Sequence, residues 1–305
     1  MTMRRYGRYT VEVSNEDKVL FPDAGFTKGD LIDYYEAIAE HFLRHAAERP
    51  LTMQRFPEGI SKDGFFQKQI GDYFPDWIAR AKLRTRQGDQ EQVLCNNRAT
   101  LVYLANQACV TPHLVLSRID RIERPDQLVF DLDPPNEEFA PVRRAAMQLR
   151  ELLDELDLRS FVKTTGSRGL HVVVALRRDI GFDDVRDFAH DAASLLACRY
   201  DEELTVEQRK DKRRGRLYLD VGRNAYGQTA VAPYAVRAKP GAPVAAPIEW
   251  DELEDDSLHA RTFDIANVPA RLERTGDPWR ALHRGGHSLR AAKRRLRELL
   301  EAERD

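Results

Sequence analysis

The chain has 305 residues, of which 42% are hydrophobic and 32% charged, a composition typical of a globular protein with a sizeable core. No apolar run approaches the roughly 18 residues of a membrane span, and the basic N-terminus lacks the apolar stretch of a secretory signal. We therefore expect a cytoplasmic protein with no membrane partner. The three cysteines show no CxxC spacing, which argues against a disulfide framework or a cysteine metal site.

The spacing of apolar residues predicts the main elements in chain order. A helix is expected over residues 28–49, where Pro50 would end it, and further helices over residues 141–156, 182–199 and 288–303. Short apolar or β-branched runs predict strands at residues 128–130, 170–176, 216–221 and 229–236. This order indicates an α+β fold in which a mixed or antiparallel sheet is flanked by helices.

The charged residues are segregated along the chain. The sum is close to neutral, −2 from 48 basic and 50 acidic residues, and by itself does not indicate a nucleic-acid-binding protein. Basic residues nevertheless cluster at 209–216 and 290–297, and acidic residues at 251–256. This distribution is compatible with one positive face, or with ordinary solvated helix and loop surfaces, and charge alone leaves both open.

Two aspartates end the most informative strand. Asp131 and Asp133 follow an apolar run and precede two prolines, and strand periodicity places both carboxylates on one face. Such carboxylates repel each other unless a cation lies between them, and oxygen ligands suit Mg²⁺ or Mn²⁺. Asp220 ends a similar run and would complete the ligand set of a two-metal phosphoryl-transfer site. The alternative is that Asp131 and Asp133 only cap the following helix.

Several motifs together resemble a known family. The segments LVFDLDPP at 128–135, VKTTGSRGLHV at 162–172 and LYLD at 217–220 resemble the three motifs of the archaeo-eukaryotic primase superfamily. With VSNEDKVLFP at 13–22, GFFQK at 64–68 and NAYGQTAVAPY at 224–234, the chain resembles more closely the polymerase domain of bacterial DNA ligase D. The resemblance runs from about residue 9 to about residue 279, in the expected order, and we treat it as specific.

The resemblance implies a role for particular residues. Two Mn²⁺ or Mg²⁺ ions would be held by the catalytic residues Asp131, Asp133 and Asp220. The nucleotide and its triphosphate would be contacted by His113, Thr165, Ser167, Arg168, His171, Arg213 and Arg237. A 5′-phosphate on the downstream side of a gap would be bound by Asn15, Lys18 and Lys28. The template strand would stack on Phe65 and Phe66, with Arg55 beside the DNA.

The chemistry of these side chains agrees with the implied roles. Arginines form bidentate bonds to phosphate oxygens, lysines act as point charges for a terminal phosphate, and adjacent aromatic rings stack on bases of any sequence. The turn at residues 166–169 would also present backbone N–H groups to an anion. Each residue alone has an ordinary structural interpretation, as a surface lysine, core phenylalanine or hydrogen-bonded histidine. Arg168 stands where many members of the family have lysine, which keeps the charge and changes the geometry.

The implied function is template-dependent primer extension and gap filling by a nucleotidyltransferase, with a preference for ribonucleotides. Its partners would be gapped or broken DNA with a 5′-phosphate, nucleoside triphosphates, and proteins such as Ku and a separate ATP-dependent ligase, at the nucleoid. We expect one compact domain over residues 1–285, with DNA-binding residues N-terminal and the catalytic sheet within 125–240, followed by a helical tail over 286–305. No ligase or nuclease domain is recognisable, so a stand-alone polymerase is expected.

Two other functions are alternatives to a polymerase. A two-metal nuclease or phosphatase could use the three aspartates but has no need of the arginines or of a 5′-phosphate pocket. A non-catalytic module that bridges DNA ends could use the fold without the aspartates. The choice between end joining and excision repair also stays open.

Overall fold

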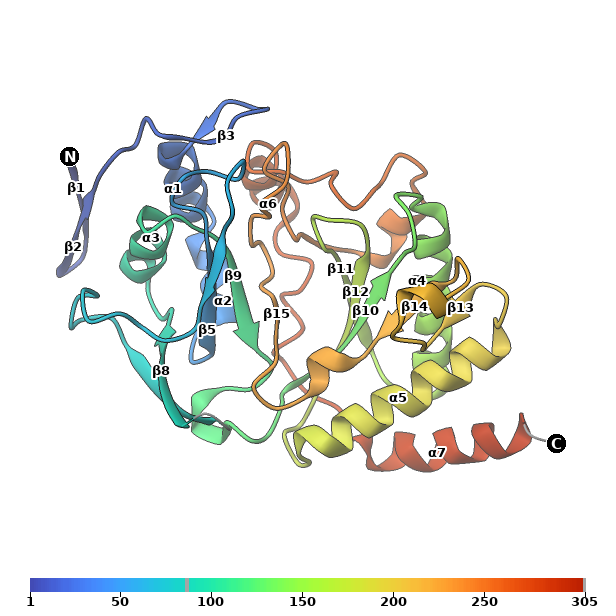
Figure 1. Ribbon diagram of the computed structural model, residues 1–305. Helices are drawn as coiled ribbons and strands as arrows, with labels where there is room; N and C mark the ends of the chain where they lie inside the picture. Colours follow the sequence, from blue (N-terminus) through green and yellow to red (C-terminus); the bar gives the residue numbers. More distant parts are fainter. Residues whose placement is uncertain (86–87, 304–305) are drawn as a thin grey trace. The chain divides into compact units, whose positions relative to one another are not determined.

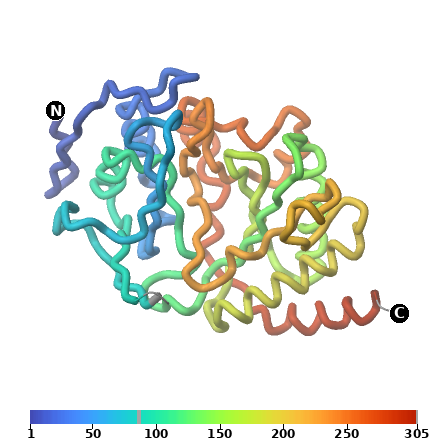
Figure 2. Tube along the Cα trace, viewed as in Figure 1, coloured from blue at the N-terminus to red at the C-terminus, as the bar shows by residue number. Residues whose placement is uncertain are grey.

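The computed structural model describes residues 1–85 and 88–303 (Figure 1). The chain forms two compact units, and it passes from the first to the second and back, as the trace in Figure 2 allows the reader to follow. Unit 1 comprises Met1–Asp120, Thr229–Ala246 and Arg261–Asp277, and unit 2 comprises Arg121–Gln228, Pro247–Ala260 and Pro278–Asp305. The sequence had indicated one compact domain with a tail.

Unit 1 is built on a sheet with the strand order β15-β9-β5-β8-β7, to which β6 adds by pairing with β5. The strands of this sheet are β5 (Pro50–Arg55), β6 (Phe65–Gln67), β7 (Arg80–Thr85), β8 (Gly88–Leu94), β9 (Cys109–Val115) and β15 (Thr229–Val231). Two small pairs precede it, β1 (Thr2–Tyr6) with β2 (Tyr9–Val13) and β3 (Val19–Phe21) with β4 (Phe26–Thr27). The helices are α1 (Lys28–Ala37), α2 (Ala39–Ala46), α3 (Arg98–Asn106) and α6 (Val268–Thr275), and η1 (Ile119–Arg121) is a single 3₁₀ turn at the boundary of the units.

The predicted helix over residues 28–49 is two helices. Thr27 begins α1 with a capping box, in which its side chain accepts from the Asp30 N–H and Asp30 accepts from the Thr27 N–H. The helix breaks at Ile38, whose φ of −92° and ψ of 5° lie outside the α region. Hydrogen bonds still flank the break, from Ile38 N–H to the Tyr34 carbonyl and from Phe42 N–H to the Ile38 carbonyl. The apolar periodicity therefore crosses the kink unchanged and contains no stop signal there.

Unit 2 is built on a mixed sheet with the order β13-β14-β10-β12-β11-β16. Its strands are β10 (Gln127–Asp133), β11 (Ser160–Thr164), β12 (Leu170–Ala175), β13 (Leu204–Thr205), β14 (Leu217–Asp220) and β16 (Pro247–Ile248). The pairing is antiparallel except between β13 and β14. The helices are α4 (Ala140–Glu155), α5 (Phe182–Arg199) and α7 (Leu289–Ala302), with 3₁₀ turns η2 (Lys210–Lys212), η3 (Gly222–Asn224) and η4 (Trp250–Glu254).

Helices α4 and α5 confirm the sequence prediction for residues 141–156 and 182–199. Both contact β10 and each other, so they cover the same face of the sheet (Figure 1). Helix α7 confirms the predicted C-terminal helix, and it packs on α5 through ion pairs from Lys293 to Asp184 and from Arg199 to Glu303. The segment expected to be a separate tail is therefore part of unit 2.

The strand predicted over residues 229–236 is shorter than expected and belongs to the sheet of unit 1. Strand β15 ends at Val231 and pairs with β9. Pro233 has no N–H for a ladder, and Tyr234 has a φ of 64°, which an extended strand cannot accommodate. Residues 229–236 thus contribute no strand to the sheet that carries the three aspartates, and the last strand of that sheet along the chain is β16.

Across the residues that the structure describes, no helix is both long enough and apolar enough to cross a membrane.

The hairpin from β11 to β12 packs tightly against β10. A Cβ atom on Gly169 would lie 1.9 Å from the Leu132 carbonyl oxygen, which is backbone and cannot move aside cheaply. Gly166, with a φ of 62°, supplies the left-handed residue that this short connection needs. A glycine is therefore required for the β12 strand to begin directly beside the two aspartates of β10.

We expect Gly169→Ala to lower the free energy of unfolding by about 1–3 kcal/mol, the usual cost of overpacking. Gly285→Ala is the matched control, because a Cβ there meets no atom within 4 Å. Chemical denaturation of both variants measures the difference. Equal stability of the two would contradict the close approach of β12 to β10.

Candidate active site

Four polar residues form a row across the sheet of unit 2. Asp131 on β10 is the register partner of Asp220 on β14 and of His171 on β12. His171 is in turn the partner of Lys163 on β11. Directly opposed residues have Cβ atoms about 4.5–5.5 Å apart and point to the same face. The register therefore brings together residues that are up to 89 positions apart, from Asp131 to Asp220.

The middle of this row is strongly polarised. The His171 Nε2 atom lies 3.5 Å from Asp131 Oδ1, and the Arg223 Nε atom lies 3.9 Å from Asp131 Oδ2. Burial and then the charge of Lys163 lower the pKa of His171 to about 4, although Asp131 acts in the opposite direction. Burial alone would raise the pKa of Asp131, but His171, Arg223 and Lys163 hold it below its usual value. His171 is neutral at pH 7 and stabilises the ionised form of Asp131 through its hydrogen bond, and the neighbouring positive charges are those of Arg223 and Lys163.

Asp133 is held differently, by two arginines. The Arg168 Nη2 atom lies 2.9 Å from Asp133 Oδ1, and the Arg213 Nη1 atom lies 3.1 Å from Asp133 Oδ2. Arg213 also donates to the carbonyls of Glu207 and Gln208 and lies 4.0 Å above the ring of Tyr218. Two of the three arginines that the sequence assigned to the nucleotide, Arg168 and Arg213, thus surround one carboxylate of the predicted metal site.

Asp220 is ordered by its own turn. Its Oδ1 atom accepts from the Gly222 N–H at 2.8 Å and lies 3.5 Å from the Tyr218 hydroxyl. Burial and then the charge of Asp220 raise the pKa of Tyr218 to about 12, so this hydroxyl keeps its proton at neutral pH. Within the described residues, the second oxygen of Asp220 accepts no hydrogen bond from an N–H or O–H group.

The turn at residues 166–169 is closed by Thr165. The Thr165 hydroxyl accepts from the N–H groups of Ser167 and Gly169, at 3.3 and 3.2 Å, and donates to the Gly169 carbonyl. The prediction that this turn presents its N–H groups to an anion is therefore wrong for those two, which point inward. The contribution of Thr165 here is to hold Gly169, the residue directly before β12 and two residues before His171.

The donor set has the chemistry of a divalent-cation site. Carboxylate oxygens are the ligands that Mg²⁺ and Mn²⁺ prefer, and Asp131 and Asp220 face each other on paired strands, with the side chain of Asp131 19% exposed. Over residues 1–85 and 88–303, however, no three acidic, histidine or cysteine side chains are gathered closely enough to form a metal-binding group. Both oxygens of Asp133 are directed at arginines. Asp131 and Asp220 thus fit the ion by donor type and by their shared row, whereas Asp133 fits it by donor type alone.

In unit 1, the predicted 5′-phosphate residues lie together. The Lys18 N–H donates to the Asn15 carbonyl, and the Lys28 N–H donates to the Lys18 carbonyl. Lys28 is 6% exposed, and its Nζ atom reaches the Asn106 carbonyl at 3.2 Å and the Ser14 hydroxyl at 3.5 Å. Burial and then the charge of Lys18 lower the pKa of Lys28. The charge of Glu16 acts on Lys28 in the opposite direction, but it is a smaller cause than the charge of Lys18.

The predicted template residues also lie in unit 1. Phe65 and Phe66 on β6 are 46% and 60% exposed, so both rings of this pair are accessible, which strand alternation alone had not indicated. Arg55 lies over the Phe65 ring at 5.5 Å and donates to the Tyr73 hydroxyl and to Gln67. His113 on β9 meets the Phe66 ring edge-on, with centroids 5.5 Å apart. Arg237 belongs to this unit too, where its N–H donates to the Pro243 carbonyl.

The nucleotide-binding residues predicted from the sequence are therefore distributed over both units. Unit 1 contributes His113 and Arg237, and unit 2 contributes Thr165, Ser167, Arg168, His171 and Arg213. Two neighbours of Asp131 were missed, Lys163 and Arg223. A signal for Lys163 existed, because it is the one lysine in the otherwise uncharged strand SFVKT, and a lysine in a buried strand is rare. Arg223 gave no comparable signal, since an arginine in a glycine-containing loop is ordinary.

An α+β fold with strand-borne aspartates on a mixed sheet, a histidine in the neighbouring strand and arginines around the carboxylates defines the class of primase-polymerase domains. The chain belongs to the LigD primase-polymerase domain family, whose model matches residues 27–279. This agrees with the resemblance seen in the sequence.

The chain is similar to parts of longer proteins. The chain is 34% identical over 278 residues to the multifunctional non-homologous end joining protein LigD of Mycolicibacterium smegmatis, covering 90% of this chain and 36% of that protein. It is 31% identical over 271 residues to the bifunctional non-homologous end joining protein LigD of Bacillus subtilis, covering 88% of this chain and 43% of that one. The chain thus spans less than half the length of these relatives.

A solved structure resembles the whole fold. The polymerase domain from Mycobacterium tuberculosis ligase D, in complex with DNA, superimposes with a TM-score of 0.85 at 31% sequence identity. The match covers 91% of this chain and 99% of that one, so both units of the present structure have counterparts in the relative.

We expect Lys163→Met to raise the pKa of His171 above about 4, because the substitution removes a neighbouring positive charge. Methionine keeps an unbranched side chain of similar length. The imidazole titration, followed by NMR in metal-free protein, measures this. Lys210→Met, which removes an exposed lysine of the same unit, serves as the control and should leave the titration unchanged.

The same shift carries a pH dependence of stability. Folding lowers the pKa of His171 from its ordinary value of 6.5 to about 4. Between pH 4 and pH 6.5, His171 is therefore protonated in the unfolded chain and neutral in the folded chain. Stability should therefore be lost as the pH falls from 6.5 toward 4, and Lys163→Met should weaken this loss. An unchanged His171 titration in Lys163→Met would show that Lys163 does not act on the row.

Proposed function

We propose that this protein extends primers on a DNA template by nucleotidyl transfer, and that it fills gaps or ends during DNA break repair. The observation that carries the proposal is the cross-strand row of Asp220, Asp131 and His171 in unit 2, beside an Asp133 bracketed by arginines. Membership of the LigD primase-polymerase family supports the reaction type. A nuclease or phosphatase would need the carboxylates but not the exposed Phe65–Phe66 pair.

Each group of residues has a part in the proposed reaction. Asp131, Asp133 and Asp220 would hold two Mn²⁺ or Mg²⁺ ions, which when bound supply activation of the primer 3′-hydroxyl and neutralisation of the charge on the leaving pyrophosphate. Arg168 and Arg213 would bind triphosphate oxygens, for which guanidinium geometry is suited. His171, neutral at pH 7, would orient Asp131 or donate a hydrogen bond to phosphate. His113 and Arg237, both in unit 1, are the other residues to which the family resemblance gives a nucleotide-binding role.

The proposal extends to substrate choice and partners. A preference for ribonucleotides, and action beside Ku and an ATP-dependent ligase, are carried over from the resemblance to the family. The names of the M. smegmatis and B. subtilis relatives place those proteins in non-homologous end joining. Extension assays with ribonucleotides and with deoxyribonucleotides in parallel test the nucleotide preference. Co-purification with Ku tests the proposed partner.

Replacement of any of the three aspartates by asparagine should abolish primer extension, with a loss of about 10³-fold or more, because metal activation contributes several kcal/mol to the transition state. Extension of a gapped duplex with saturating Mn²⁺ measures the rate. Asp191→Asn, an exposed aspartate on α5, is the matched control and should retain full activity. Release of pyrophosphate in step with extension separates a polymerase from a nuclease. Near-normal extension by Asp220→Asn would exclude it from the catalytic set.

We further propose that Asn15, Lys18 and Lys28 bind the 5′-phosphate on the downstream side of a gap. A terminal phosphate carries more charge than an internal diester, and the two lysines lie close enough for the charge of one to lower the pKa of the other. Lys28 has no carboxylate partner among the described residues, whereas Lys18 pairs with Glu58 at 2.9 Å. Lys28 is therefore the better-prepared phosphate ligand of the two.

Lys28→Met should weaken binding of 5′-phosphorylated gapped DNA by about 10–100-fold, the range expected from losing one charged hydrogen bond in a partly buried site. Binding of the same DNA with a 5′-hydroxyl should change little. Fluorescence anisotropy on both DNAs measures the ratio, with Lys62→Met, an exposed lysine of unit 1, as control. Equal losses on both DNAs would reduce Lys28 to a general backbone contact.

A further inference from the structure

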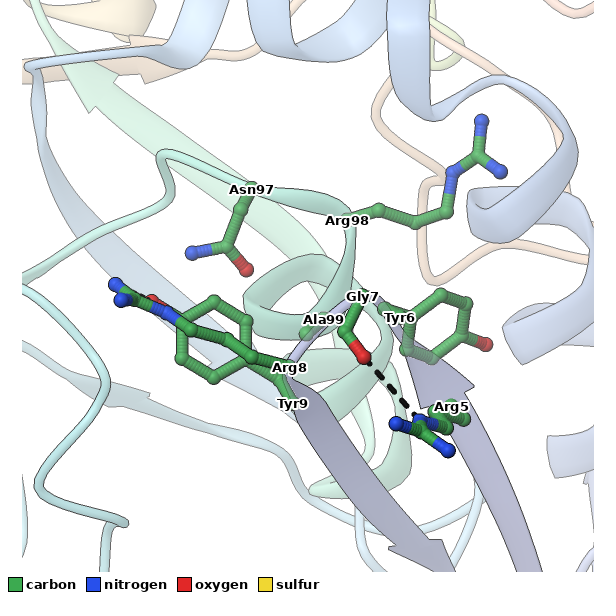
Figure 3. Close-up of a pocket in the computed structure, with 8 residues that line it drawn as sticks. All are labelled: Arg5, Tyr6, Gly7, Arg8, Tyr9, Asn97, Arg98 and Ala99. Carbon is green, nitrogen blue, oxygen red and sulfur yellow. Dashed lines mark hydrogen bonds between the residues drawn. The ribbon is translucent and has the colours of Figure 1, made fainter.

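A second basic cluster lies in unit 1, around the turn between β1 and β2. Arg5, Arg8 and Arg98 line a hollow of about 510 Å³ together with Tyr6, Gly7, Tyr9, Asn97 and Ala99 (Figure 3). We call these three side chains the guanidinium cluster. Figure 3 shows that they do not converge on one point, since Arg8 extends on the side of Asn97 and the other two on the side of Tyr6.

The charges of the guanidinium cluster are not neutralised by the protein. Arg5 donates to the Gly7 carbonyl at 3.3 Å and Arg8 to the Tyr9 hydroxyl at 2.8 Å, and within the described residues no carboxylate lies within ion-pair distance of any of the three. The neighbouring Arg4 shows the contrast, because it pairs with Glu16, Asp33 and Glu36. Successive strand residues face opposite ways, so the acidic residues meet Arg4 on one face and leave Arg5 on the other.

One guanidinium of the cluster is held in place by aromatic rings. The Arg8 guanidinium lies 5.0 Å from the centroid of the Tyr9 ring, and the indole of Trp77 is stacked on Tyr9 with centroids 4.8 Å apart. The Tyr9 ring thus contacts both Trp77 and the Arg8 guanidinium. The ring restricts the motion of the Arg8 side chain. Arg8 therefore loses less conformational entropy on binding than an unrestrained arginine would.

Helix α3 connects this cluster to the lysines of the proposed 5′-phosphate site. Arg98 is its first residue and Asn106 its last, and the Asn106 carbonyl accepts from Lys28. The Asn106 side chain also binds the end of β2, accepting from the Ser14 N–H and donating to the Glu12 carbonyl. At 1.5 Å per residue, the two ends of α3 are about 12 Å apart. This equals the rise of about three to four base pairs of duplex DNA.

We propose that the guanidinium cluster Arg5, Arg8 and Arg98 is a docking surface for the phosphate backbone of the duplex downstream of a gap, several base pairs beyond the 5′-phosphate. The inference rests on the proposed function, in which Lys28 binds that phosphate. Divergent arginines match successive phosphates of a polyanion and not a single small anion. Because guanidinium groups without a carboxylate partner attract phosphates of any sequence, the contact is to the backbone and independent of base sequence.

The test compares DNA arms of two lengths. Gapped DNAs carry a downstream arm of about 3 or about 12 base pairs, closed by a hairpin loop, with either a 5′-phosphate or a 5′-hydroxyl. Three neutralised phosphates steepen the salt dependence, so raising salt from about 50 to about 200 mM should weaken wild-type binding of the long arm by about 40-fold more than that of the short arm. Arg5→Gln with Arg8→Gln and Arg98→Gln should remove this difference and keep the preference for a 5′-phosphate.

The control removes the same charge from another element. Arg294→Gln with Arg295→Gln and Arg297→Gln changes three exposed arginines of α7 in unit 2. If the cluster variant kept the wild-type dependence on arm length and salt, or if the α7 variant lost it equally, the docking surface would be excluded. A wild-type protein that did not distinguish the two 5′ ends would overturn the proposed 5′-phosphate site instead, while arm length would still decide the guanidinium cluster on either DNA.

Discussion

The register between β10 and its two neighbours is the constraint on which the candidate site depends. Asp131 meets Asp220 on one side and His171 on the other only because β14 and β12 pair with β10 in this alignment. A slip of one residue on either side would turn one partner to the opposite face of the sheet. The tight approach of Gly169 to the Leu132 carbonyl limits such a slip, since only glycine fits there. Packing at a residue with no chemistry of its own thus decides which polar groups share a face.

The two carboxylates of β10 are treated differently by their surroundings. Asp133 has an arginine on each oxygen, so its charge is balanced within unit 2. Asp131 has His171 at 3.5 Å and Arg223 at 3.9 Å, and these two residues together with Lys163 hold its pKa below the usual value. A carboxylate that stays ionised without a close N–H donor on every oxygen retains lone pairs for a cation. The sequence spacing DxD presents the two as equivalent, and their electrostatic environments distinguish them.

The sequence predicted what depends on local pattern and missed what depends on pairing. Helices α4, α5 and α7 follow from apolar periodicity, and the aspartates follow from their position at strand ends. The kink at Ile38 and the early end of β15 were not predicted, because the first leaves the periodicity intact and the second turns on the φ of Tyr234. Lys163 was overlooked for a related reason. Its place beside His171 comes from the register of β11 with β12, which no single segment contains.

The neutral sum of charges conceals how the basic residues of unit 1 are distributed. Arg4 is surrounded by three carboxylates and contributes little to the field outside the protein, whereas Arg5, one residue later, points to the opposite face and is exposed. Opposite charges that neutralise each other on one face leave the other face positive, because the potential near a surface follows the nearest uncompensated charges and is screened beyond about 10 Å at moderate salt. A polyanion senses that local potential. In this chain, one strand carries a paired arginine on one face and an arginine without a carboxylate partner on the other. Net charge is consequently a poor guide to nucleic-acid binding here.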